Sequence, residues 1–361
     1  LFPGETVEAE LRWKPRHGEG KVLRWIRKDP RRAVAACPVA DQCGGCELWE
    51  AGEHQADLKR LMVEDLFRRQ LGDPAFAWHP APPEAKRHRI QLHWDGALLG
   101  FHRRASHAVV PVKGCPAAVD PLSDAISRLA EALEGGVLPR RSQRWELATG
   151  APEGVIVATD ESGRTWRLDP DGWHRSGDPI VETVAGADLR HEPGGFFQVS
   201  PAWAAEAFGG LLESWKVQGT TLFDLFGGVG LFSALLRKRF RRFVLVESFE
   251  PAVAWARRNL EELGLEAECV TADVAEWTPE GLGAPGDLIL LDPPRAGLDA
   301  ALSGKLLTAK ADRMVLVGCD GAAFCRDLKR LAPGWEVVQL AALDLFPLTH
   351  HVECVALLKR L

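Results

Sequence analysis

The sequence contains no hydrophobic segment long enough to cross a membrane as a helix. No stretch approaches the roughly eighteen uncharged apolar residues that such a helix needs. The first residues also lack the basic and then apolar pattern of a secretory leader. These absences argue against a membrane protein and predict a cytoplasmic one.

A general excess of basic charge is missing as well. With 44 Lys and Arg against 50 Asp and Glu, the formal net charge is −6, which argues against a uniformly basic nucleic-acid binder. Basic residues still cluster locally, and the local field is what attracts a polyanion such as RNA. Taken singly, each cluster is typical of a solvated face; the clusters lie at residues 24–32, 86–89, 140–144 and 237–242.

In other respects the chain has the composition of a globular protein. It has 361 residues, 46% hydrophobic and 26% charged, which is enough for two or three domains. Residues 5–11 and 21–26 alternate polar and apolar side chains. This pattern predicts a β-hairpin that either pairs with later strands or belongs to a small barrel. Apolar spacing over residues 49–70 predicts an amphipathic helix that ends at Gly72.

The eight cysteines fall into two groups, one in the first third of the chain and one in the last. A disulfide framework is not expected in a large chain of cytoplasmic character, so metal binding or catalysis is the sharper interpretation. Cys37, Cys43 and Cys46 share one glycine-containing loop, and Cys115 precedes a proline, as cluster ligands often do. We predict that these four thiols hold a [4Fe–4S] cluster, with structural zinc and unliganded core thiols as the alternatives.

β-Strand patterns dominate the following region, which predicts a central α+β domain over residues 37–190. An Asp-Gly turn at residues 95–96 separates two strand patterns and is a strong hairpin signal. A helix is expected over residues 124–133, and strands at 89–94, 98–101, 144–149, 155–159 and 165–168. His93, His102 and His107 lack metal-like spacing and are expected to be surface or hydrogen-bonded residues.

From about residue 190 onward, strand and helix patterns alternate, which predicts an α/β domain with a doubly wound parallel sheet over residues 191–361. A glycine loop at residues 227–230 lets backbone amides approach a ligand where a helix begins. Glu247 ends the next strand, where a carboxylate can bind the hydroxyls of a ribose. The expected strands end near residues 225, 247, 273, 292 and 319, and helices are expected over 231–238 and 251–263.

A glycine loop with a downstream acid fits either a dinucleotide or S-adenosylmethionine. The Asp-Pro-Pro-Arg sequence at residues 292–295 favours S-adenosylmethionine, because it places a carboxylate and rigid carbonyls where a planar base can be held beside a transferable methyl group. Base-nitrogen methyltransferases use a related acid-Pro-Pro sequence, so both classes remain open at this point.

Cys319 and Glu353 distinguish between these classes. Carbon 5 of a pyrimidine is a poor nucleophile until a thiolate adds to carbon 6, and a base must then remove the carbon 5 proton. Cys319 ends an apolar strand, and Glu353 lies near the end of the same domain. The ordinary alternatives are a cysteine that fills the core and an acid on the surface.

These residues, in this order, resemble the RNA uracil-5 methyltransferases that carry an iron–sulfur cluster. The resemblance covers nearly the whole chain: the four cysteines, the Phe-Phe-Gln sequence at 196–198, the glycine loop, the Asp-Pro-Pro-Arg sequence, Cys319 and the segment 346–353. It implies a Rossmann-like methyltransferase domain. It also implies that residues 1–36 are a partial β-barrel of the OB-type, TRAM-like RNA-binding kind.

The resemblance implies a role for each site residue. Cys319 would be the nucleophile and Glu353 the proton acceptor. S-adenosylmethionine would be held by Gln198, Phe226, Glu247, Asp273 and Asp292. The implied substrate is RNA, with ribosomal RNA preferred over transfer RNA, and the expected protein is a monomer. Gly318 and Gly321 depart from the family pattern, and we expect them to loosen the nucleophile loop.

Two other functions remain as alternatives from the sequence alone. One is a base-nitrogen methyltransferase that uses Asp292, and the other is a non-catalytic, cluster-bearing RNA-binding protein. If methyl transfer does not require Cys319, the base-nitrogen methyltransferase is favoured. If the protein does not bind S-adenosylmethionine, the non-catalytic RNA-binding protein is favoured.

Overall fold

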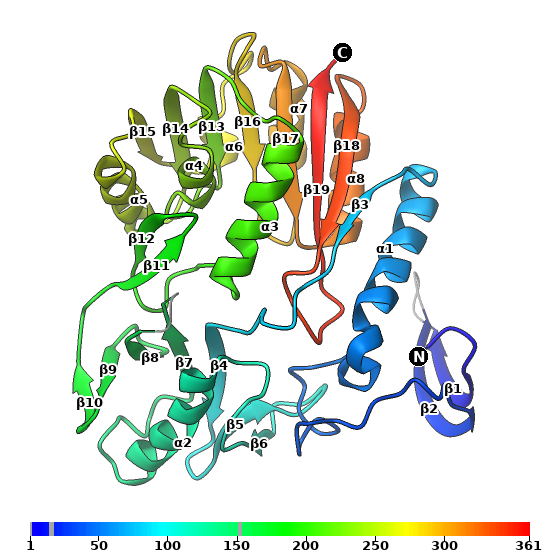
Figure 1. Ribbon diagram of the computed structural model, residues 1–361, viewed down its shortest axis with the longest axis vertical. Coiled ribbons are helices and arrows are strands. Elements are labelled where there is room, and N and C mark those ends of the chain that lie inside the picture. The colour runs from blue at the N-terminus through cyan, green and yellow to red at the C-terminus, as the bar shows by residue number, and fades with distance from the viewer. Residues whose placement is uncertain (1, 14–17, 151–153) are drawn as a thin grey trace.

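The computed structural model describes residues 2–13, 18–150 and 154–361. Figure 1 shows an eight-stranded sheet flanked by helices in its upper half and a smaller, mostly antiparallel body below it. The hairpin of β1 (Thr6–Trp13) and β2 (Gly18–Arg27) lies to one side, as its alternating pattern predicts. Within the described ranges, no helix has the length and apolar character needed to cross a membrane.

The upper sheet has the strand order β15-β14-β13-β16-β17-β19-β18-β3. Its five parallel strands are buried apolar runs, which is typical of strands covered on both faces. They are β13 (Thr221–Leu225), β14 (Arg242–Glu247), β15 (Ala267–Thr271), β16 (Leu288–Leu291) and β17 (Arg313–Gly318).

The expectation of a wholly parallel sheet is wrong at one edge. β19 (Glu353–Arg360) runs antiparallel to both β17 and β18 (Trp335–Leu343), because the chain turns back through a loop without a crossover helix. β3 (Ala77–His79), from the first third of the chain, adds a strand beside β18. The sheet is therefore mixed, and a segment far away in the sequence completes it.

Helices cover the two faces of this sheet. One face packs against α3 (Pro201–Ser214) and α4 (Leu231–Leu235), and the opposite face packs against α1 (Gln55–Leu71), α6 (Val274–Trp277), α7 (Ala300–Leu307) and α8 (Gly321–Leu331). α5 (Glu250–Glu262) lies over β14 and β15. Helix α3 was not predicted. Helix α4 is shorter than predicted, because residues 236–239 turn back and the carbonyl of Arg239 accepts the amide of Gly219.

The lower sheet has the order β10-β9-β8-β7-β4-β5-β6 and packs one face against α2 (Asp120–Glu134). Its strands are β4 (Arg89–Trp94), β5 (Leu99–His102), β6 (Val109–Pro111), β7 (Arg144–Thr149), β8 (Ile156–Asp160), β9 (Thr165–Asp169) and β10 (Gly172–Arg175). The predicted strands at 89–94, 144–149, 155–159 and 165–168 are confirmed to within a residue or two. A hairpin of β11 (Ile180–Val184) and β12 (Ala187–His191) then leads toward α3.

The predicted three-domain division remains a prediction, and the packing crosses one of its boundaries. Helix α1 and strand β3 precede residue 190 but pack on the upper sheet, where Phe67 of α1 contacts Phe324 of α8. A short 3-10 helix (Trp49–His54) leads into α1. The first third of the chain therefore contributes to both bodies.

Candidate active site

Three predicted site residues lie together at one edge of the upper sheet. Asp292 follows β16, Cys319 follows β17, and Glu353 begins the antiparallel strand β19. Gly318 pairs with Cys354, so continuing this register by one residue places Cys319 opposite Glu353. This edge is formed by the carboxyl ends of the parallel strands, where ligands bind in open α/β sheets.

The same residues also share one face of the sheet. Side chains alternate between faces along a strand. Val315 and Val317 of β17 belong to the core that packs on α3 and α4, so Cys319 continues their face. By the same alternation, Leu290 places Asp292 on that face and Val355 places Glu353 there. The nucleophile and both acids therefore point to one side.

The side chain of Glu353 is 6% exposed, and its Oε2 has no hydrogen-bond partner within the described part of the chain. Burial, reinforced by repulsion from Asp292, holds the pKa of Glu353 well above its ordinary value, while Arg295 opposes the shift. Burial also raises the pKa of Asp292. When it is ionised, a carboxylate with a raised pKa is a stronger base than an ordinary one, and its free oxygen is open to a proton.

Burial, followed by repulsion from Glu353 and Asp292, raises the pKa of the Cys319 thiol to about 11. Arg295 opposes this rise. The loop that carries Arg295 and the loop that carries Cys319 line the same narrow crevice, which has room for about 10 Å³. In this state the sulfur is mainly a thiol, and additional positive charge near it would favour the thiolate.

The expectation of a loose nucleophile loop is not supported by the packing around its two glycines. A Cβ on Gly318 would lie 3.1 Å from two atoms of Phe324, and a Cβ on Gly321 would lie 2.4 Å from Cδ2 of Leu66. Both glycines therefore permit close packing of α8 and α1 against the end of β17. Asp320 further fixes the turn, because its Oδ1 accepts the amide of Ala323 at 2.8 Å and caps α8.

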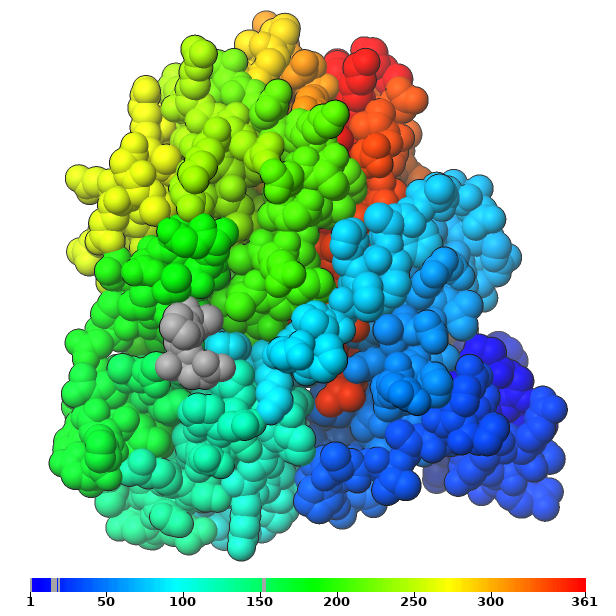
Figure 2. Space-filling model, viewed as in Figure 1, coloured from blue at the N-terminus to red at the C-terminus, as the bar shows by residue number. Residues whose placement is uncertain are grey.

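A loop of residues 344–352, called the base loop below, joins β18 to β19 and ends at Glu353. The Lys59 ammonium is fully buried and donates to Oδ1 of Asp344 at 2.6 Å and to the carbonyl oxygens of Phe346 and His351. Figure 2 shows a red part of the tail at the surface between blue and cyan segments from the first third of the chain. The position of Glu353 therefore depends on contacts between the base loop and helix α1.

The base loop also contacts the predicted cluster loop. The amide of Leu48 donates to the carbonyl oxygen of Leu348 at 2.9 Å, and Oε2 of Glu47 lies 2.8 Å from Nδ1 of His350. Glu47 and Leu48 directly follow Cys46 in the sequence. The thiol loop and the segment that ends at Glu353 are therefore neighbours.

The glycine loop after β13 has the shape of a ligand cradle. Phe226 and Gly228 both have positive φ, 62° and 53°, and a Cβ on Gly228 would meet nothing within 4 Å. Oε2 of Glu247 accepts a hydrogen bond from the amide of Gly228 at 3.3 Å, and Oε1 of Glu247 accepts one from the amide of Phe249. The acid is thus held beside an open space at the start of a helix.

The remaining predicted cofactor residues lie on neighbouring segments. Asp273 follows β15, and its Oδ1 caps α6 by accepting the amides of Ala275 and Glu276. Gln198 is buried just before α3. With Phe226, Glu247 and Asp292, these residues follow the ends of four adjacent strands or lead into the helix that covers them. This set of residues fits a ligand laid across the carboxyl edge of the sheet.

Asp224 is a buried acid that sequence reasoning did not single out. Its Oδ2 accepts both the hydroxyl and the amide of Ser233 in α4, whereas its Oδ1 has no partner among the residues described. Burial raises the pKa of Asp224 to about 6. Its charge in turn contributes to the raised pKa of Asp292. The sequence signal was an acid three residues before the glycine loop.

Asp224→Asn should make stability less dependent on pH. Since the pKa in the folded state is above the ordinary value of 3.8, the associated stabilisation is complete below about pH 4 and is lost as pH rises through 6. We expect the free energy of unfolding of the wild type to fall by about 1 kcal/mol more than that of the variant between pH 5 and pH 8. Urea denaturation at both pH values measures this difference, and parallel pH profiles would contradict it.

The four predicted cluster ligands converge in the structure. Burial raises the pKa of Cys46 to about 11, and Cys115, Cys43 and Cys37 each add to the rise, so all four thiols lie within electrostatic range. All four are in described segments, yet no three of their sulfurs come within 4.8 Å of one another. Tetrahedral zinc with Zn–S bonds of about 2.3 Å would bring the sulfurs to about 3.8 Å from one another. The four thiols therefore share one region without the close spacing of bound zinc ligands.

Two arginines lie beside these thiols. Arg87 lowers the pKa values of Cys43, Cys46 and Cys115, and Arg104 donates to the carbonyl oxygen of Cys46 at 3.3 Å. Cationic side chains of this kind offset the negative charge of thiolate ligands.

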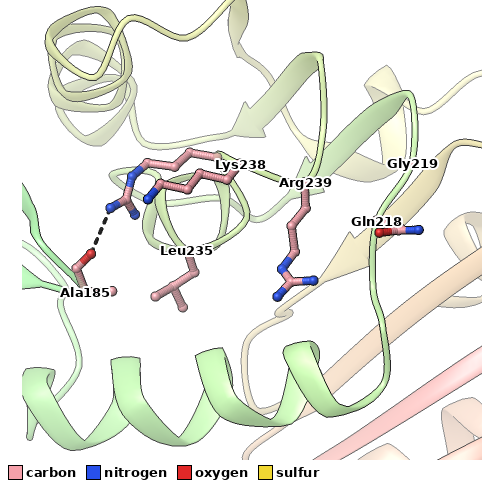
Figure 3. A pocket seen from close by; sticks show the side chains of 7 residues that line it. Ala185, Gln218, Gly219, Leu235, Lys238 and Arg239 are labelled. Carbon is pink, nitrogen blue, oxygen red and sulfur yellow. Dashed lines mark hydrogen bonds between the residues drawn. The ribbon is translucent and has the colours of Figure 1, made fainter.

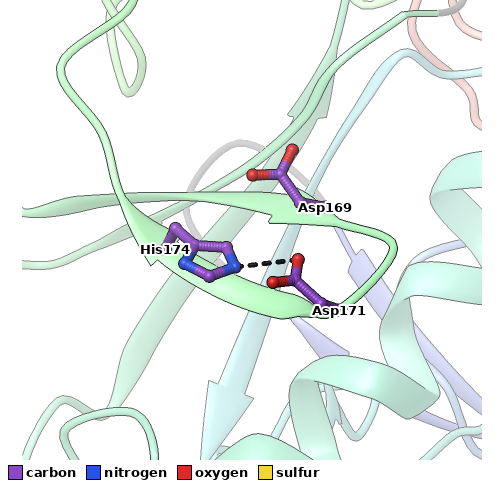
Figure 4. Close-up of side chains that lie close together, drawn as sticks. All are labelled: Asp169, Asp171 and His174. Carbon is purple, nitrogen blue, oxygen red and sulfur yellow. Dashed lines mark hydrogen bonds and ion pairs between the residues drawn. The ribbon is translucent and has the colours of Figure 1, made fainter.

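Two other features lie away from this site. Figure 3 shows a shallow hollow lined by Lys238 and Arg239, at the opposite end of β13 from the glycine loop. Arg237 there donates to the carbonyl oxygen of Ala185. Figure 4 shows Asp169, Asp171 and His174, a surface group in which His174 lies 3.0 Å from Asp171. Neither feature contributes a residue to the carboxyl edge.

Comparison with known proteins identifies the family. The profile of the tRNA (uracil-5-)-methyltransferase family matches residues 286–361, which include Cys319 and Glu353. A 23S rRNA (uracil(1939)-C(5))-methyltransferase of Edwardsiella ictaluri is 30% identical, over 99% of this chain and 89% of its own length. The chain belongs to the RNA uracil-5 methyltransferase family.

Other relatives agree with this membership. An RNA methyltransferase of Gloeobacter violaceus is 30% identical over 99% of this chain and 90% of its own length. The crystal structure of the Pyrococcus abyssi tRNA (uracil-54, C5)-methyltransferase, solved with S-adenosyl-L-homocysteine, is 26% identical and superposes with a TM-score of 0.76. It covers 98% of this chain and 92% of that one. The predicted family, fold class and enzyme class are confirmed, and the base-nitrogen and non-catalytic alternatives are not supported.

Proposed function

We propose that this uracil-5 methyltransferase acts on a uridine of 23S ribosomal RNA and that Cys319 and Glu353 perform the chemistry. The observation that carries the assignment of residues is the pairing of β17 with β19, which puts the thiol opposite a buried carboxyl with a free oxygen. The relatives named for 23S rRNA, 29% to 30% identical over most of their length, support the choice of substrate.

In the proposed reaction, the Cys319 thiolate adds to carbon 6 of the uracil, and the electron pair displaced from the double bond makes carbon 5 nucleophilic. S-adenosylmethionine supplies the methyl group when it is bound. Glu353 then removes the proton from carbon 5, and the resulting electron pair re-forms the double bond and expels the Cys319 thiolate. Asp292, on the same face, is placed to hold the uracil.

For S-adenosylmethionine we propose the ligands Gln198, Phe226, Glu247, Asp273 and Asp292. Glu247 would bind the ribose hydroxyls, because its carboxylate already lies beside the open space at Gly228. Phe226 and Asp292 border the same cradle from β13 and β16. Asp224 and Glu353 each have an unpartnered oxygen and interact electrostatically with Asp292, so they add negative charge at this edge, which fits a cationic ligand.

The proposed substrate is tested by incubating the purified protein with 23S rRNA or tRNA transcripts that carry tritium at uracil carbon 5. Release of tritium into water from 23S rRNA, dependent on S-adenosylmethionine, is expected. Release from tRNA alone would move the assignment to tRNA, to which the Pyrococcus abyssi structure refers. No release from either RNA would contradict the proposed function.

We also propose that Cys37, Cys43, Cys46 and Cys115 hold a [4Fe–4S] cluster. The convergence of the four thiols and the nearby Arg87 and Arg104 support it. Gly44 allows the backbone of the thiol loop to lie close to the end of β5, since a Cβ on Gly44 would lie 3.1 Å from the carbonyl oxygen of His102. By binding Cys115, which follows β6, as well as the three cysteines of the thiol loop, the cluster would hold that loop against the lower sheet, next to the base loop.

Cys46→Ser should abolish most iron binding and lower thermal stability. The wild type is expected to be brown, with about four iron atoms and acid-labile sulfide per chain. Cys269→Ser serves as the control, because Cys269 lies in β15, away from the thiol loop. A colourless wild type containing zinc, or a Cys46→Ser variant with full iron content, would contradict this assignment.

The hairpin β1–β2 is proposed to be part of an RNA-binding barrel. Trp13, Leu23 and Ile26 are more than half exposed, which is unusual for large apolar side chains of a strand pair. Exposed apolar side chains of this kind fit either further barrel strands or RNA bases.

A further inference from the structure

The lower sheet has one face that α2 does not cover. In β4, Ile90, Leu92 and Trp94 pack into the core against α2, so the alternate residues Arg89, Gln91 and His93 lie on the opposite face. In the same way, His102 of β5 and Arg144 of β7 lie opposite the core. We call the surface formed by Gln91, His93, His102 and Arg144 the outer face.

The outer face carries a stack of imidazole rings. His93 and His102 lie on neighbouring strands with ring centroids 3.4 Å apart and planes inclined by 15°. His107 meets the ring of His102 edge-on, with centroids 5.2 Å apart. His93 and His102 are half-buried and His107 is exposed. From the sequence, these histidines were expected to be surface or hydrogen-bonded residues, and the structure brings the three rings together into one aromatic cluster.

Charges around this cluster are mostly positive. Arg144 pairs with His93 in the strand register and is exposed, and Arg104, two residues after His102, is exposed as well. The acid of this face, Glu146, is bound by Arg89 at 2.8 Å. Burial, with further contributions from His102 and Arg144, lowers the pKa of His93. The stacked rings are therefore mainly neutral at pH 7 and act as flat π surfaces rather than as charges.

One end of the outer face leads to the active site. Arg89 donates to the carbonyl oxygens of Phe197 and Gly195, in the segment that carries Gln198. His93 lies four residues further along β4, about 13 Å away at the usual rise of a strand. The other end reaches the thiol loop, where the amide of Gly44 donates to the carbonyl oxygen of His102 at 3.0 Å.

We propose that the outer face binds a single-stranded stretch of the RNA substrate next to the target uridine. An RNA base continues the stack of His93 and His102, while Arg144 and Arg104 contact phosphates. Exposed aromatic rings on an open sheet face, flanked by basic residues, form a common platform for single-stranded RNA. This inference rests on the proposed function, since it names where its RNA substrate lies.

The test is RNA binding by the double variant His93→Ala/His102→Ala. A short fluorescein-labelled single-stranded RNA of mixed sequence serves as the probe, and its Kd is measured by fluorescence anisotropy. Loss of a stacked base should raise the Kd about tenfold. S-adenosylmethionine affinity, measured by calorimetry, should not change. The control is His174→Ala, which removes an exposed histidine from β10 at the far edge of the same sheet (Figure 4).

A second variant, His93→Phe/His102→Phe, separates stacking from folding. It keeps flat rings and should retain wild-type affinity. Wild-type affinity in the alanine variant would overturn the inference, and so would a phenylalanine variant that binds as weakly as the alanine variant. Arg144→Glu should weaken binding and reduce its salt dependence. If the wild type binds RNA through this face but releases no tritium from it, the proposed function fails while the RNA surface stands.

Discussion

Cys319→Ala is expected to lower methyl transfer by at least about 10⁴-fold, because it removes the thiolate whose addition to carbon 6 makes carbon 5 nucleophilic. Cys319 is half-buried, and Cys269 and the thiol-loop cysteines lie on other elements. Tritium release from carbon 5 and methyl incorporation should fall together, since both follow formation of the bond to carbon 6. Single-turnover assays with labelled RNA and S-adenosylmethionine measure both quantities.

Cys325→Ala is the matched control for this prediction. Cys325 lies six residues further along in α8, is fully buried and belongs to the core of the sheet. Its truncation should cost some stability but leave the methyl transfer rate close to that of the wild type. A Cys319→Ala variant that keeps more than a small fraction of wild-type turnover would exclude the covalent route.

Glu353→Gln should behave differently from Cys319→Ala. The amide keeps the size of the side chain but cannot accept the proton, so the adduct of Cys319 with RNA should form and then persist. Denaturing electrophoresis should therefore show a protein–RNA band with Glu353→Gln and none with Cys319→Ala.

The sequence allowed part of this site to be predicted because strand ends are local features. Asp292 and Cys319 each follow a buried apolar run, and parallel strands bring their carboxyl ends to one edge. The location of Glu353 was not available from local pattern, because it depends on antiparallel pairing of β19 with β17. From the sequence, this acid was linked to the cysteine by the chemistry of carbon 5 methylation and by the family resemblance, not by a structural pattern.

Contacts between distant segments account for what could not be predicted. β3 joins a sheet whose other strands lie more than 140 residues later, and the stacking of His93 on His102 depends on the register of two strands. Lys59 was one of several basic residues on a predicted amphipathic helix, and its pattern gave no sign of complete burial. Such pairings are set by tertiary packing rather than by propensity.

Lys59 provides the second prediction with a large effect. Its ammonium and the Asp344 carboxylate are 0% and 1% exposed and lie 2.6 Å apart. Lys59→Met keeps an unbranched side chain but removes the ammonium that neutralises Asp344 and takes one donor from each of two loop carbonyls, while the amide of Phe346 still donates to Oδ1 of Asp344. Breaking a buried pair from one side costs about 3–5 kcal/mol, and we expect this loss in the free energy of unfolding. Burial already raises the pKa of Asp344.

The pH dependence of the stability of Lys59→Met and a control substitution at the neighbouring Arg60 make this prediction specific. Without Lys59, the pKa of Asp344 should rise further, so the deficit of Lys59→Met should be small when the acid is protonated and grow as pH increases. Arg60→Met is the control, since Arg60 is 58% exposed and pairs with Glu64 one turn away, a contact worth less than about 1 kcal/mol. Because the Lys59 contacts hold the base loop that ends at Glu353, Lys59→Met should also lower kcat more than it raises KM for RNA. Equal denaturation midpoints for the two variants would show that the base loop does not depend on this buried pair.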